Sequence, residues 1–167
     1  MMNEYIVWAK KSISKAIPLL IVVMISALLI SCFPQSNEPS NLEATEELRT
    51  AVTMPLSLYA PIMSSVPGFP IEVEFPSSWV ASGYDVIVTC KNGMLISWNS
   101  PDYRVNEQGI SYKLSSSSTI YWSPYRMQKM PSDDTLTFTL YKGNKQIGQI
   151  TVEIKANDQG FYNGMMK

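Results

Sequence analysis

Hydrophobic and polar residues alternate with a period of two from residue 71 onward, and this pattern limits the fold more than any other feature. Seven short segments follow it, separated by turn residues: 71–75, 84–90, 94–98, 110–114, 120–122, 136–140 and 150–154. Such alternation is typical of strands with one buried face. We therefore expect an all-β domain over residues 70–156, an antiparallel β-sandwich of about seven strands, with residues 157–167 as a C-terminal tail.

The turn at residues 91–93 can be tested for strand register. A two-residue loop would place Trp98 on the face opposite Val88. A three-residue loop brings Val88 opposite Ile96 and keeps the large apolar side chains on one face, which a one-residue slip would not. The sequence therefore predicts a β-hairpin with the longer loop and with Gly93 in the left-handed conformation.

A second hairpin turn is expected at residues 143–144, Gly-Asn. Beyond this turn the alternation breaks, because Ile147 and Ile150 are three positions apart. One extra residue near positions 148–149, a β-bulge, restores the alternation and places Phe138 opposite Ile150. Each sheet then has one buried face, which predicts two sheets packed together.

This arrangement resembles an immunoglobulin-like sandwich in architecture only. Cys90 and Trp98 could supply the first Cys and the Trp of the immunoglobulin pattern, but the domain has no second Cys. Packing would have to replace the missing disulfide, and the strand order stays open. Cys90 itself falls on the apolar face, so we expect it to be an inert thiol in the core.

The N-terminal residues have the composition of a secretory leader. Lys10, Lys11 and Lys15 precede an uncharged apolar run over residues 16–30. A basic start followed by an apolar run of this kind is typical of a signal peptide, whose apolar part forms a helix.

Residues 29–32, Leu-Ile-Ser-Cys, resemble the lipobox of bacterial lipoproteins. In that family a diacylglycerol is attached to the Cys thiol, the leader is cut before the Cys, and further acyl chains complete the anchor. The resemblance implies that residues 1–31 are a lipoprotein signal peptide and that Cys32 anchors the protein to a membrane of the bacterial cell envelope, outside the cytoplasm. The alternative is an uncleaved anchor over residues 16–33, which are just long enough to span a bilayer.

Residues 32–69 are expected to be a spacer between the lipid and the strands. The spacer begins with polar, proline-containing sequence typical of a tether. Ser40 and Glu43 then fit a capping box, which predicts a short helix over residues 41–51. Four prolines at residues 54–70 predict an extended, irregular chain after this helix.

The charge of the mature chain restricts its partners. Removal of residues 1–31 leaves 10 Lys and Arg (13 minus 3) against 13 Asp and Glu (14 minus 1), a formal charge of −3. This balance argues against nucleic acid and against electrostatic docking to anionic lipids. The chain contains no histidine, which excludes His-based catalytic triads and His metal sites.

Few patterns indicate catalysis or metal binding. Glu72 and Glu74 share one strand face about 7 Å apart, a separation compatible with glycosidase carboxylates, but the alternation predicts that both are solvated. Residues 133–134 (Asp-Asp) and 157–160 (Asn-Asp-Gln-Gly) could contact calcium, yet turn chemistry explains both better. No catalytic residue, metal site or cofactor is expected, apart from the lipid on Cys32.

Aromatic residues outside the expected core are the leading candidate for a binding surface. They fall in loops or on the polar side of strands, with one arginine beside them: Trp79, Tyr103, Tyr121, Tyr125 and Arg126. Exposed aromatic rings can bind sugars or form a protein hot spot, whereas the alternative is that they fill the ends of the sandwich. Trp122 is expected to point inward.

The preferred interpretation is a lipid-anchored envelope protein whose β-domain binds or scaffolds through contacts with proteins or cell-wall polymers, without catalysis. The alternatives are a carbohydrate-binding accessory domain, a carboxylate-based hydrolase, and a subunit whose edge strand is covered by a partner strand. A cleft with two carboxyl groups, at least one of them buried among apolar side chains, would favour the hydrolase.

Overall fold

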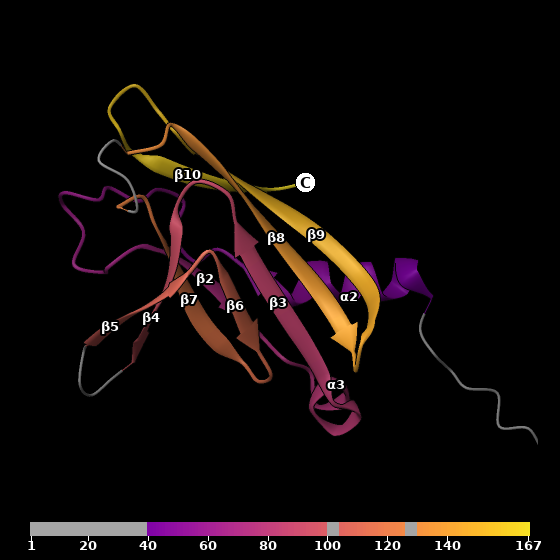
Figure 1. Ribbon diagram of the computed structural model, residues 1–167. Helices are drawn as coiled ribbons and strands as arrows, with labels where there is room; N and C mark the ends of the chain where they lie inside the picture. The colour runs from indigo at the N-terminus through magenta and orange to yellow at the C-terminus, as the bar shows by residue number, and fades with distance from the viewer. Residues whose placement is uncertain (1–39, 100–103, 126–129) are drawn as a thin grey trace, which may run out of the picture. The chain divides into compact units, whose positions relative to one another are not determined.

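The computed structural model describes residues 40–99, 104–125 and 130–167 (Figure 1). This part of the chain is mostly β, with two antiparallel sheets of five strands each and two helices, as expected for an all-β, sandwich-like domain. Within these ranges neither helix is long and apolar enough to cross a membrane. The predicted signal peptide and Cys32 lie outside the described residues.

Each sheet draws its strands from distant parts of the sequence. Sheet A has, in spatial order, β1 (Val52–Thr53), β2 (Phe69–Val73), β7 (Ser118–Ser123), β4 (Met94–Asn99) and β5 (Arg104–Gly109). Sheet B has, in spatial order, β10 (Tyr162–Met166), β9 (Lys145–Ala156), β8 (Asp133–Lys142), β3 (Tyr84–Cys90) and β6 (Ser111–Leu114). The seven predicted strands are all present, and β1, β5 and β10 are additional.

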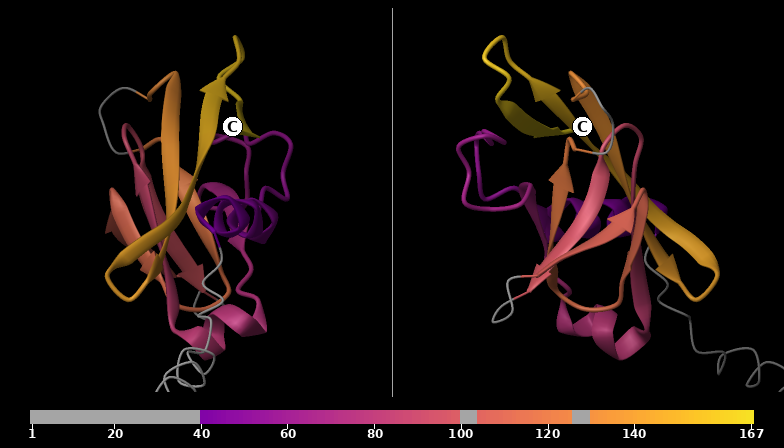
Figure 2. Two further views of the ribbon diagram at one scale, coloured as in Figure 1. Left: turned by 90° about the vertical axis from the view of Figure 1, so that its right-hand side faces the viewer. Right: turned by 60° about the vertical axis from the view of Figure 1, so that its left-hand side comes forward.

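Helix α2 (Asn41–Ala51) confirms the helix and the capping box predicted from the sequence. The Ser40 hydroxyl accepts from the Glu43 backbone N–H at 3.2 Å, and the Glu43 carboxylate accepts from the Ser40 N–H at 2.9 Å. Ala44 and Leu48 are buried, and the helix packs against β9 (Figure 2). The backbones of α2 and β9 lie close together at Gly148, because a Cβ at this position would be 3.0 Å from the Ala44 carbonyl oxygen.

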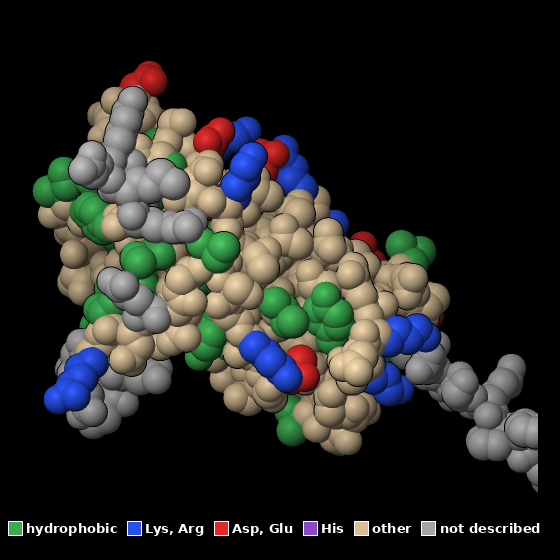
Figure 3. All heavy atoms as spheres, in the orientation of Figure 1, with side chains coloured by type: hydrophobic (Ala, Val, Ile, Leu, Met, Phe, Trp, Pro, Cys, Tyr) green, Lys and Arg blue, Asp and Glu red, His purple; other side chains and the backbone are tan. Residues whose placement is uncertain are grey.

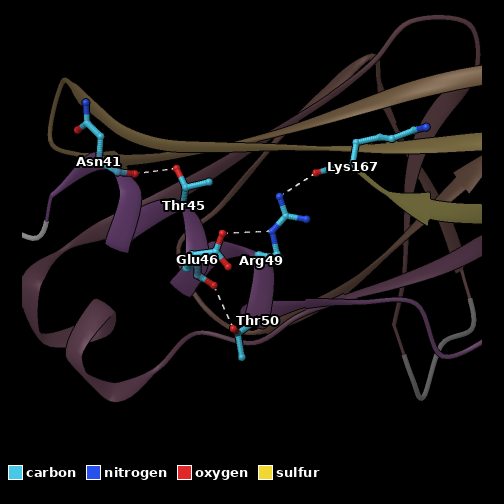
Figure 4. A network of polar contacts seen from close by, with 6 residues as sticks. All are labelled: Asn41, Thr45, Glu46, Arg49, Thr50 and Lys167. Carbon is cyan, nitrogen blue, oxygen red and sulfur yellow. Dashed lines mark hydrogen bonds and ion pairs between the residues drawn. The ribbon is translucent and has the colours of Figure 1, made fainter.

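The C-terminal residue is also tied to this helix. The Arg49 guanidinium donates to the Lys167 carbonyl oxygen at 2.9 Å and lies 3.6 Å from the Glu46 carboxylate (Figure 4). The prediction of a C-terminal tail is wrong for residues 162–166, because these residues form strand β10, which pairs with β9. The predicted spacer likewise contributes α2 and β1 to the same core as the strands.

Trp79 lies in the core and not on the predicted binding surface. It belongs to α3 (Ser77–Ser82) and is only 1% exposed, with its ring edge-on to Phe75 at a centroid distance of 5.5 Å. Its indole N–H donates to the Glu47 carboxylate of α2 at 2.9 Å. Trp79 thus fills one end of the domain beneath the helix, which is the packing alternative considered for the aromatic residues.

The predicted hairpin at residues 91–93 is wrong. β3 pairs with β6 and β8 in sheet B, whereas β4 pairs with β5 and β7 in sheet A, so the turn carries the chain from one sheet to the other. Gly93 is not among the described glycines with positive φ. Glycine is needed at this position because there is no room for a side chain: a Cβ would collide with the indole nitrogen of Trp122.

The hairpin of β8 and β9 confirms most of the second turn prediction. Gly143 and Asn144 separate the paired residues Lys142 and Lys145, and further along the two strands Phe138 lies opposite Ile150. The register shift falls between Leu140 and Tyr141, which pair with Gly148 and Gln146. The extra residue is therefore Ile147, one position before the predicted bulge, and its side chain is buried in the core.

Candidate functional site

An open groove of about 470 Å³ lies beside sheet A, between the irregular segment after β1 and the strands β4 and β5. We call it the aromatic groove, and its described lining is Tyr59, Pro61, Ser64, Ser65, Val66, Pro67, Trp98, Val105 and Tyr125. Three aromatic rings, two prolines and two serine hydroxyls thus meet in one open depression, and these lining side chains are uncharged.

Tyr59 is the fixed wall of this groove. Its backbone forms an isolated β-bridge with Tyr162 through hydrogen bonds of 2.7 and 2.8 Å, and its ring stands edge-on to Phe69. Burial, followed by the neighbouring phenols of Tyr125 and Tyr162, raises the pKa of Tyr59 to about 12. The Tyr59 hydroxyl is therefore neutral at physiological pH.

Trp98 forms the opposite wall, on the outer face of sheet A. Its ring packs edge-on against Tyr121 at a centroid distance of 5.7 Å and an interplanar angle of 78°. Tyr121 is 9% exposed, and burial together with the negative charge of Glu72 raises its pKa. An edge-to-face pair of this kind holds the indole in one orientation before any ligand arrives.

Tyr125 follows β7 and is the most exposed of the three aromatic rings that line the groove. Half of its surface is accessible to solvent, and its backbone N–H donates to the Ser123 hydroxyl at 3.3 Å. Val105 of β5, also 50% exposed, lies in the same lining. The groove therefore combines the ring of Tyr59, which is only 2% exposed, and the ring of Trp98, which Tyr121 holds, with the half-exposed ring of Tyr125.

Of the predicted surface residues that the structure describes, only Tyr125 lines this groove, and Tyr121 is buried and not on the surface. Tyr121 supports Trp98, while Trp79 is buried elsewhere; Tyr103 and Arg126 lie outside the described residues. The sequence interpretation missed Tyr59 and Trp98.

Trp98 was missed because the wrong hairpin placed it on the buried face of its strand. A stronger signal was available in the chain itself: residues 50–71 contain no Lys, Arg, Asp or Glu. Figure 3 shows apolar side chains gathered at the end of the domain where this segment meets β4 and β5.

The other candidate residues are structural or solvated. Glu72 and Glu74 are both exposed, as the alternation predicted, so neither provides the buried carboxyl group that a general acid needs. Cys90 is buried, which confirms its place in the core, and its thiol donates to the Gly93 carbonyl oxygen.

Of the two candidate calcium segments, residues 157–160 form a turn, whereas Asp133 and Asp134 begin strand β8, which corrects the turn expected there. The Asn157 side-chain oxygen accepts from the backbone N–H groups of Gln159 and Phe161, which closes an Asx-type turn. The Asp134 carboxylate is only 3% exposed and is occupied by backbone and indole donors. Across the described ranges, no three His, Cys, Asp or Glu side chains are grouped so that they could hold a metal ion.

Comparison with protein-family models gives no match to this chain, and searches of curated proteins and of solved structures give none either. The geometry of the aromatic groove is therefore the main basis for a functional proposal.

Proposed function

We propose that this chain is a lipid-anchored protein of the bacterial cell envelope whose β-domain binds an envelope protein or a cell-wall polymer, without catalysis. The observation that carries the proposal is the aromatic groove, in which Tyr59, Trp98 and Tyr125 surround one open depression. The lipobox resemblance of residues 29–32 supports the anchor and the extracytoplasmic location.

The groove lining suits a neutral, chain-like ligand. Aromatic faces bind the apolar faces of sugar rings or of proline residues, and the hydroxyl groups of Ser64 and Ser65 can exchange hydrogen bonds with the ligand. Because the groove is open, a polymer segment can cross it without its ends having to enter a pocket.

The groove favours binding because Tyr59 and Trp98 are held in position by other residues before a ligand binds. Tyr59 is held by its bridge to Tyr162, and Trp98 is held by Tyr121. A ligand then orders few side chains when it binds, which lowers the entropic cost of association. Immunoglobulin-like sandwiches also commonly present binding loops at one end of the domain, and the architectural resemblance is part of this proposal.

A hydrolase is the weaker alternative. Its best carboxylate pair, Glu72 and Glu74, is exposed on the strand face, where burial cannot convert either group into a general acid at neutral pH.

Affinity capture from native membranes tests the proposal. The full chain serves as bait beside two groove variants, Trp98→Ala and Tyr125→Ala, and a control, Tyr141→Ala, which removes a half-buried ring from sheet B. We expect each groove variant to lose roughly tenfold or more of the captured partner, the range for a hot-spot aromatic, while the control keeps it. Equal capture by the three variants and the wild-type chain would overturn the assignment of the groove.

A further inference from the structure

We propose that the irregular segment over residues 54–67 docks on the surface of the same lipid bilayer that holds the anchor. We call it the docking segment. This inference rests on the proposed lipid anchor; it concerns the exposed tip of the segment that also lines the aromatic groove, and it has its own test.

The docking segment exposes large apolar side chains along a stretch without charge. Residues 50–71 contain no Lys, Arg, Asp or Glu. Ile62 is 87% exposed and Met63 is 79% exposed, more than any other large hydrophobic side chain in the described part of the chain. Leu56 and Leu58 add further exposed apolar surface at 37% and 46%. Apolar surface of this kind on a folded domain marks a contact with a membrane or a protein.

The backbone presents Ile62 and Met63 at the tip of a turn. The Met63 N–H donates to the Ala60 carbonyl oxygen at 3.0 Å, which closes the turn beneath the two side chains. Tyr59 fixes one end of the turn through its bridge to Tyr162. The tip can therefore enter an apolar medium while the base of the segment keeps its backbone hydrogen bonds.

The surroundings of the tip match the border between lipid and water. Trp98 and Tyr125 line the groove beside the docking segment, and these two residue types concentrate at the headgroup level of membranes. Arg104 is exposed and precedes the groove residue Val105 in β5. An uncharged tip makes docking depend on apolar burial and not on anionic lipid.

The length of chain between the anchor and the domain favours a lipid occupant. Seven residues, 33–39, separate Cys32 from the described chain and span at most about 25 Å. Helix α2, which leads from that point toward the docking segment, is about 16 Å long from its 11 residues. A lipid on Cys32 would thus hold the whole domain near the bilayer at high effective concentration, so that even weak docking by the tip is populated.

Fluorescence of the full chain in proteoliposomes tests this proposal. An environment-sensitive dye is attached at Ile62→Cys, and the control carries it at Val80→Cys, a 58% exposed apolar position on α3, at a different end of the domain (Figure 2). The wild-type chain treated with the same dye supplies the background from its own cysteines. The vesicles contain phosphatidylcholine with or without a nitroxide-labelled lipid, and an intact mass of each sample reports whether Cys32 carries lipid.

We expect nitroxide lipid to reduce the emission at position 62 by roughly twofold, because interfacial segments lie about 5–10 Å into the headgroup region, and to leave position 80 unchanged. Replacement of part of the phosphatidylcholine by phosphatidylglycerol should change neither result. Unchanged emission at position 62 overturns the docking, and so does a blue shift without quenching, which would indicate a protein contact. Quenching at position 62 on a chain whose Cys32 carries no lipid would keep the docking and refute the lipid anchor.

Discussion

The indole N–H of Trp122 donates a 2.6 Å hydrogen bond to the carboxylate of Asp134, and this buried contact joins the two sheets. Trp122 belongs to β7 of sheet A and Asp134 to β8 of sheet B. The same carboxylate accepts from the backbone N–H groups of the turn that crosses between the sheets, at residues Lys91, Asn92 and Gly93, over 2.7–2.9 Å. One carboxylate therefore fixes the path of the chain from β3 to β4.

Replacement of this carboxylate should destabilise the domain strongly. The two carboxylate oxygens of Asp134 accept from both the crossing turn and Trp122. Asp134→Asn keeps only one acceptor oxygen for these donors. We expect a loss of about 3 kcal/mol in the free energy of unfolding, since buried donors lose hydrogen bonds to a charged partner. Urea denaturation measures this loss.

The matched control is the neighbouring Asp133→Asn, because Asp133 is exposed. Its expected effect is within about 0.5 kcal/mol, as for an ordinary surface substitution. Similar losses for the two variants would show that Asp134 does not have the structural role assigned to it.

Glycine is required at Gly93 for space and at Gly143 for its backbone conformation, and alanine substitutions at the two positions distinguish these causes. A Cβ at Gly93 would collide with the Trp122 indole and lie 2.7 Å from the Ser123 carbonyl oxygen, so we expect a loss of about 3 kcal/mol. A Cβ at Gly143 meets open space, and only its φ of +59° opposes the substitution, at a cost of about 1 kcal/mol. Urea denaturation of both variants checks the order, and a larger loss at Gly143 would contradict it.

Alkaline pH should weaken the fold through its buried tyrosines. Burial raises the pKa of Tyr59 to about 12, while the unfolded chain titrates near the ordinary value of 10. Between these two values the unfolded state has lost the proton that the folded state keeps, so stability is full below pH 10 and falls as the pH rises toward 12. Tyr162 and Tyr121, whose pKa values burial also raises, act in the same direction.

Urea midpoints measured from pH 8 to pH 12 should therefore decrease above pH 10. Tyr59→Phe should decrease less steeply than the wild-type chain, because it removes one of the groups that titrate on unfolding. A parallel decrease in both proteins would mean that Tyr59 titrates normally in the folded state.

The Cys90 thiol should be protected from reagents. It is 6% exposed and donates to the Gly93 carbonyl oxygen, so modification requires the structure to open. We expect modification at least ~100-fold slower than in the urea-unfolded chain, which corresponds to an opening free energy of about 2.8 kcal/mol or more. Stopped-flow reaction with a disulfide reagent measures both rates, and equal rates would remove Cys90 from the core.

Local sequence patterns predicted the parts of the fold that local contacts determine. The capping residues Ser40 and Glu43 located the start of α2, and alternation located the seven predicted strands. The β8–β9 hairpin was also predictable, because its turn and its broken alternation lie within one continuous stretch of sequence.

Long-range contacts determined what the sequence did not reveal. The turn at residues 91–93 has the composition of a hairpin, but Asp134, more than forty positions away, accepts from its backbone and directs it between the sheets. Trp98 therefore lies on the opposite face from the one predicted, and the uncharged stretch over residues 50–71 was the signal that could have indicated the groove beside it. β10 was missed because its residues, Tyr-Asn-Gly-Met-Met, lack alternation and are ordered by β9.

The intact mass of the chain, extracted from bacterial membranes in detergent, tests the proposed lipid anchor most directly. We predict a polypeptide that begins at Cys32 and carries the added mass of a diacylglycerol and acyl chains, and a Cys32→Ser variant that keeps residues 1–31 and gains no lipid. A wild-type chain that still carries residues 1–31, with an unmodified Cys32, would contradict the account.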